Sequence, residues 1–135
     1  MEISKQMPKV KLLVVDDDSG IRTQLKWGLD SYDVITANSR EKAITQFESN
    51  RPSLVTLDLG LPPDAEGTSE GFAILQAILA RAPKTKVVVV SGSDELINSK
   101  IALERGAFEF YPKPIDIDDL KSILEKAYIE FKGSL

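Results

Sequence analysis

The stretch VKLLVVDDD, residues 10–18, decides the fold of this chain of 135 residues. Its first part, residues 10–15, is a nearly continuous apolar run, interrupted only by Lys11. A short run of this kind is typical of a strand that is buried on both faces, as in parallel sheets. We therefore expect a central strand that delivers Asp16, Asp17 and Asp18 at its carboxyl end.

Two later apolar runs repeat the pattern: residues 54–57 are followed directly by Asp58, and residues 87–90 by Ser91. Residues 34–37 and 107–111 are weaker strand candidates. Between the strands, apolar residues recur three or four positions apart, which predicts amphipathic helices. The five stripes are Ile21/Leu25/Leu29, Ala43/Ile44/Phe47, Phe72/Leu75/Leu79, Ile97/Ile101 and Leu120/Ile123/Leu124/Ala127/Phe131. Gly106 follows the fourth stripe at a position typical of a helix-ending glycine.

Five strands alternating with five helices predict one α/β domain built as a three-layer sandwich. Right-handed crossovers leave few ways to wind it, and we expect a flavodoxin-like parallel sheet of order 2-1-3-4-5. Residues 61–70, rich in Pro, Asp, Glu and Gly, are predicted to form a long surface loop.

Composition narrows the chemistry. The chain has no Cys and no His, which excludes disulfides, thiolate or imidazole metal ligands and a histidine base. The net charge of -4 disfavours direct binding to nucleic acid or anionic lipid. Neither a membrane-spanning run nor an apolar signal core is found in the sequence, so we expect a cytoplasmic protein.

Ligands of open α/β sheets bind outside the carboxyl ends of the strands. Here those ends carry the three aspartates, Asp58, Ser91 and Lys113. Clustered carboxylates stay ionised together only beside a cation, and oxygen ligands without His suit Mg²⁺. Helix capping is the alternative role for any one of Asp16 to Asp18, although a helix needs only one cap.

The remaining candidates each have a functional and a structural interpretation. Asp58 could be a nucleophile that attacks phosphorus with the help of a metal, or simply a solvated acid at the end of a strand. Lys113, between two prolines, could pair with a carboxylate or a phosphoryl oxygen, or it could be a surface lysine in a turn. Its bond to Pro114 is a candidate cis bond. Ser91 could donate to a phosphoryl oxygen, or it could be a turn or N-cap serine. Phe110 could be a switch residue or a residue of the core.

The motifs LLVVDDD, TLDLGLP, VVVVSGS and GAFEFYPKP resemble, in order and spacing, the receiver domains of two-component response regulators. The resemblance covers residues 9–131 and implies a CheY-like receiver domain, with residues 1–8 and 132–135 as tails. It implies that Asp58 is the phosphoacceptor, and that Asp16, Asp17, Asp58 and the Gly60 carbonyl hold Mg²⁺. Ser91 and Lys113 take the places of the hydroxyl and lysine that meet the phosphoryl group. Ser91 and Phe110 are the implied switch residues, and Lys113–Pro114 the implied cis bond.

The resemblance also implies partners. A sensor histidine kinase would donate the phosphoryl group, and the domain itself would not be a turnover enzyme. The face formed by the fourth helix, fifth strand and fifth helix would control an output, in particular transcription, with a homodimer through that face. ATPase and DNA-binding domains outside this chain are further expected partners. The stretch GLPPDAEGTSEG is about five residues longer than the usual family turn, and is similar to NtrC-type regulators of PEP-CTERM systems.

Three other functions fit parts of the sequence. A haloacid-dehalogenase-type phosphatase also uses an aspartate nucleophile, but its second Asp would fall at Gly60. A pseudo-receiver would share the fold without phosphorylation. A nucleotide-binding domain is disfavoured because no glycine-rich loop follows a strand.

Overall fold

The computed structural model describes residues 8–92 and 94–135. In chain order its elements are β1 (Lys11–Val15), α2 (Ser19–Gly28), β2 (Asp33–Ala37), α3 (Arg40–Asn50), β3 (Leu54–Leu57), α4 (Ser69–Arg81), β4 (Lys86–Ser91), α5 (Glu95–Glu104), β5 (Glu109–Pro112) and α6 (Ile117–Gly133). The strands form one parallel sheet of order β2-β1-β3-β4-β5. The predicted fold class and strand order are therefore confirmed.

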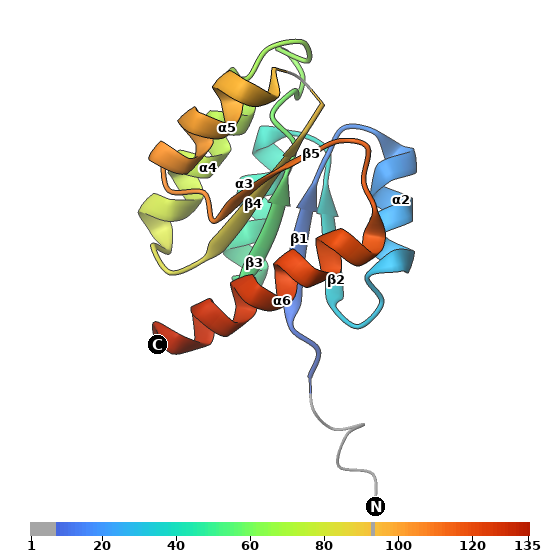
Figure 1. The fold of residues 1–135 in the computed structure, drawn as a ribbon, viewed down its shortest axis with the longest axis vertical. Coiled ribbons are helices and arrows are strands. Elements are labelled where there is room, and N and C mark those ends of the chain that lie inside the picture. The colour runs from blue at the N-terminus through green and yellow to red at the C-terminus, as the bar shows by residue number, and fades with distance from the viewer. Residues whose placement is uncertain (1–7, 93) are drawn as a thin grey trace, which may run out of the picture.

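Helices cover both faces of the sheet (Figure 1). On one face, α3, α4 and α5 pack through Phe47, Leu75 and Ala102 against alternate strand residues. On the other, α2 and α6 pack through Leu25 and Leu124 against the intervening strand residues. Strands buried on both faces must be apolar at successive positions, which explains the runs in the sequence.

The register of the sheet aligns the carboxyl ends of its strands. Val15 pairs with Ala37 on one side and with Leu57 on the other. Leu57 pairs in turn with Val89, two residues before Ser91. The polar residues that follow β1 and β3 must therefore emerge next to each other at one edge.

Local signals fix where two of the helices begin and end. The Asp18 carboxylate caps α2 by accepting hydrogen bonds from the backbone N–H groups of Gly20 and Ile21. After α5, Gly106 adopts a φ of 103°, a left-handed conformation that favours glycine, as its position in the sequence predicts. Of the three aspartates after β1, Asp18 is thus the cap of α2.

Two expectations from the sequence are wrong. Residues 61–70 are not all surface loop, because α4 begins at Ser69 and both Leu61 and Glu70 are buried. In α5 the predicted stripe faces the core only in part: Ile101 packs against the core, but Ile97 is exposed, whereas Asn98 and Ala102 are buried. Tertiary packing selects a helix face that two isoleucines alone do not determine.

No helix in the described parts of the chain is both long enough and apolar enough to cross a membrane.

Candidate functional site

The two buried carboxylates of the site, Asp16 and Asp58, are held by the sheet itself. The Asp58 N–H donates to the Val15 carbonyl at 2.9 Å, and the Asp16 N–H donates to the Ala37 carbonyl at 3.1 Å. Asp16 and Asp58 expose only 3% and 7% of their surfaces. Their backbones thus continue the ladder by one residue and fix both side chains at the carboxyl edge.

The ammonium of Lys113 reaches both carboxylates. Its Nζ lies 3.0 Å from Asp16 Oδ2 and 3.6 Å from Asp58 Oδ1. The Lys113 N–H donates to the Ser91 carbonyl at 2.9 Å, which ties the turn after β5 to the end of β4. The Lys113–Pro114 bond is cis, as expected from the sequence. The residues that directly follow β1, β3 and β5 therefore meet in one cluster.

The acids also fit a divalent cation. One carboxylate oxygen from each of Asp16, Asp17 and Asp58 lies within 4.8 Å of the other two. Asp17 is exposed while the other two are buried, so the group opens to solvent on one side. All three donors are hard oxygens, which suits Mg²⁺ bound by a few carboxylates and several waters. The donor set therefore fits the expected metal.

The local electrostatics favour a proton or a cation at Asp58. Burial raises the pKa of Asp58 to about 6, and the neighbouring charge of Asp16 acts in the same direction. The Lys113 ammonium and the Gly60 N–H, which donates to the carboxylate, oppose the rise without cancelling it. For Lys113, burial works against the charged form, but the Asp16 hydrogen bond and the Asp58 charge outweigh it and raise the lysine pKa. The cluster thus has a surplus of negative charge that one ammonium does not neutralise.

Ser91 and Phe110 lie on the same face of the sheet. Val89 pairs with Phe110, and Ser91 follows Val89 by two residues, so its side chain points to the same side. Ser91 is 2% exposed and Phe110 is 7% exposed, and the ring belongs to the core beneath α3, α4 and α5. The ring is therefore already inward in this structure.

Gly60 lies under the segment that connects β3 to α4. A Cβ added at Gly60 would collide with the backbone carbonyl oxygen of Ala65. The segment is held at both ends, because Leu61 bridges to Asp64 and the Asp64 carboxylate accepts from the hydroxyl of Ser69 at 2.6 Å. Its length therefore lets it fold back over the residue expected to supply a carbonyl ligand.

Two contacts of the site have no counterpart in the sequence analysis. Arg22, on the second turn of α2, donates from Nη1 to the Asp16 carbonyl at 2.9 Å. Arg40 pairs with Glu70 at 3.3 Å and joins the first turns of α3 and α4. Both depend on how helices pack at the sheet edge. A spacing of six residues between Asp16 and Arg22 is the only local clue, and it is a weak one.

The family of response regulator receiver domains matches residues 12–125 of the chain. Among curated proteins, the chain is 30% identical over 130 residues to the alkaline phosphatase synthesis transcriptional regulatory protein PhoP of Bacillus subtilis. It is 31% identical over 123 residues to the DNA-binding transcriptional regulator NtrC of Azospirillum brasilense. These matches cover 92% and 90% of the chain, but only 52% and 24% of the two relatives. The chain thus spans about half or less of their length.

Comparison with solved structures also finds a receiver domain. A response regulator receiver domain protein from Clostridium thermocellum superposes with a TM-score of 0.85 at 30% identity. The alignment covers 93% of this chain and 99% of that one.

Proposed function

Because the chain belongs to the family of response regulator receiver domains, we propose that Asp58 accepts a phosphoryl group from the phosphohistidine of a sensor histidine kinase. A carboxylate oxygen of Asp58 attacks the phosphorus, the phosphorus–nitrogen bond of the donor breaks, and the electron pair leaves with the imidazole. The observation that carries this proposal is the cluster itself, in which Asp58 lies 3.6 Å from the Lys113 ammonium.

Each neighbour has a role that its position supports. Lys113 holds an oxygen of the transferred group, since its ammonium already faces both buried carboxylates. Asp16, Asp17, Asp58 and the Gly60 carbonyl hold Mg²⁺, which when bound offsets negative charge on the phosphoryl oxygens. Ser91, at the end of β4, donates a hydrogen bond from its hydroxyl to a phosphoryl oxygen.

The readout is a shift in population between two packings of the sheet face. Ser91 and Phe110 share that face, so closure of Ser91 onto the phosphoryl group favours the inward ring. The free domain samples both ring positions, and phosphorylation selects one. A shift from 1:99 to 99:1 requires about 5.5 kcal/mol of differential stabilisation.

The output surface is the face of α5, β5 and α6. Leu96, Ile97 and Leu103 on α5 are large apolar residues that remain exposed, which supports a protein partner there. We place a homodimer contact on this face, and the output in ATPase and DNA-binding domains outside the chain. The receiver unit spans residues 9–131. Both curated relatives described above are transcriptional regulators, which supports control of transcription as the output.

The decisive experiment is labelling by acetyl phosphate with Mg²⁺, followed by intact mass spectrometry. One phosphoryl group should be added to the wild-type chain and to Asp30→Asn, a matched change at an exposed acid. No addition should occur in Asp58→Asn, or after removal of Mg²⁺ by EDTA. Labelling of Asp58→Asn would reject the site.

The same reaction separates the alternatives. A phosphatase would hydrolyse p-nitrophenyl phosphate with continuous turnover, whereas a receiver would not turn over this ester and would carry at most one phosphoryl group per chain. A pseudo-receiver would neither be labelled nor bind Mg²⁺.

A further inference from the structure

One of the two edges of the described sheet is formed by β2. In the described sheet, β2 lies at one end of the strand order and pairs only with β1. Its middle residues, Val34, Ile35 and Thr36, are only half-buried, although Val34 and Ile35 pack against the two cores of the domain. An uncovered edge strand is a template for pairing with another chain.

Some backbone N–H and C=O groups of β2 point away from the sheet. The Asp33 N–H donates to the Val10 carbonyl at 2.9 Å, and the Ala37 carbonyl accepts from Asp16 at 3.1 Å, so both residues bond toward β1. Because backbone groups alternate in direction along a strand, Val34 and Thr36 direct their N–H and C=O groups away from the sheet. The edge thus offers both donors and acceptors.

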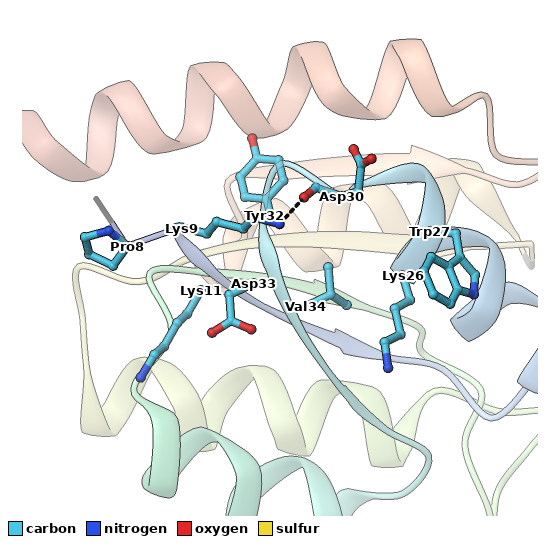
Figure 2. Close-up of a pocket in the computed structure, with 9 residues that line it drawn as sticks. All are labelled: Pro8, Lys9, Lys11, Lys26, Trp27, Asp30, Tyr32, Asp33 and Val34. Atoms are coloured by element: carbon cyan, nitrogen blue, oxygen red, sulfur yellow. Dashed lines mark hydrogen bonds between the residues drawn. The ribbon is translucent and has the colours of Figure 1, made fainter. Parts of the chain in front are cut away.

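Three adjoining hollows follow this edge. The first, about 510 Å³, is lined by Lys11, Lys26, Trp27 and Val34 among others (Figure 2). The second, about 220 Å³, shares Lys26 with the first and adds Thr36. The third, about 180 Å³, shares Thr36 and Arg22 with the second. Because neighbouring hollows share walls, they form one groove along β2, which we call the β2 groove.

The β2 groove differs in charge from the rest of the protein. Its basic side chains are Lys9, Lys11, Arg22, Lys26 and Lys42. Only two carboxylates line it, those of Asp30 and Asp33, so the groove carries a surplus of positive charge while the whole chain is at -4. At its far wall, Trp27 exposes 72% of its surface. A large exposed aromatic next to cations is a typical anchor at a protein interface.

We propose that the β2 groove binds an extended, acidic peptide segment of a partner protein, which adds to the sheet as a sixth strand beside β2. The segment pairs its backbone with Val34 and Thr36, and its acidic side chains meet the lysines on either side. An apolar residue of the segment packs on Trp27. β2 has five residues, so the bound stretch is of similar length.

Two other occupants fit less well. A second copy of the chain would bring one positive groove against another across a two-fold axis, and like charges would repel. A nucleic acid strand would satisfy the lysines, but its phosphates have no donors for the outward carbonyl groups of the edge. A peptide backbone supplies donors and acceptors together.

The test uses a fluorescein-labelled peptide of four Val-Glu repeats and the 135-residue chain, read by fluorescence anisotropy. Saturable binding is expected, weakening at least tenfold between low and high salt because surface charges are screened. The same peptide with alternate backbone amides methylated should bind at least tenfold more weakly, since it cannot pair with the edge. Equal binding of the methylated peptide would overturn the proposal, and this comparison needs no change in the protein.

Variants locate the site. The pair Lys11→Glu and Lys26→Glu should weaken binding at least tenfold, whereas Lys126→Glu, an exposed change on α6, should not. Thr36→Pro removes an outward N–H at an edge position that tolerates proline, and should abolish binding, while Thr36→Val should retain it. Tighter binding of a single-stranded oligonucleotide than of the peptide, or dimerisation through β2 in sedimentation velocity, would also overturn the proposal.

Discussion

The ammonium of Lys113 lies 3.0 Å from Asp16 Oδ2, closer than its 3.6 Å approach to Asp58. The lysine is therefore shared between two carboxylates that would otherwise repel each other across the end of the sheet. Both carboxylates are buried, so each depends on the few charges that remain nearby. The stability and the chemistry of the site are consequently coupled through these side chains.

Replacing Lys113 should make this dependence visible. Lys113→Met should lower the free energy of unfolding at pH 7 by about 1–3 kcal/mol, because two buried carboxylates lose their cationic partner. The loss should be smaller at pH 5, where Asp58 is largely protonated. Urea unfolding at the two pH values measures this, with Lys100→Met on α5 as the control at an exposed position. A loss that does not depend on pH would contradict the shared-charge account.

Asp58 should destabilise the metal-free protein when it ionises. Its pKa is raised to about 6 by burial and by Asp16, above the ordinary aspartate value of 3.8. Between these two values the native state holds a proton that the unfolded state has lost. The free energy of unfolding should therefore fall as pH rises through this window, and stay lowered above it.

Asp58→Asn removes that penalty. The variant should be more stable than the wild type at pH 8 without divalent cations, by about 1–3 kcal/mol, and should show little gain at pH 4. Thermal unfolding at both pH values gives the comparison, and Asp30→Asn at an exposed site should change little. A gain of the same size at both pH values would show that burial of the charge is not the cause.

Magnesium should stabilise the chain with the opposite dependence on pH. At pH 8, above its pKa of about 6, Asp58 is ionised and accepts the cation, whereas at pH 5 protons compete with the cation for Asp58. Mg²⁺ at about 100 times its dissociation constant should add about 2.7 kcal/mol at pH 8. Thermal shift titrations with Mg²⁺, repeated with Asp17→Asn, test this. An unchanged titration for Asp17→Asn would remove that residue from the metal site.

Gly60→Ala tests the segment that folds back over the site. The added methyl group would meet the Ala65 carbonyl, so the segment must move, at a cost of about 1–3 kcal/mol in stability. Mg²⁺ affinity should fall as well, because the displaced backbone carries the expected carbonyl ligand. Gly133→Ala, where the added atom has nothing within 4 Å, is the matched control. Equal melting temperatures for the two variants would show that the segment yields freely.

The sequence predicted the sheet and the meeting of Asp16, Asp58 and Lys113 because both follow from simple geometry. Doubly buried strands must be apolar throughout, and parallel strands bring their carboxyl ends to one edge. The same patterns do not determine which face of a helix meets the core, so Ile97 was misplaced. They also carry no information about contacts between distant segments, such as Ala65 over Gly60 or Arg40 with Glu70. The β2 groove depends on strand order and on where helices leave an edge open, neither of which a local pattern states.

Arg22 has one further consequence. Its guanidinium holds the Asp16 carbonyl, and its side chain also lines two hollows of the β2 groove. The acidic cluster and the β2 groove are therefore neighbouring sites that share Arg22. If a peptide bound in the β2 groove changes the affinity of the acidic cluster for Mg²⁺ by some factor, then Mg²⁺ must change the affinity of the groove for the peptide by the same factor.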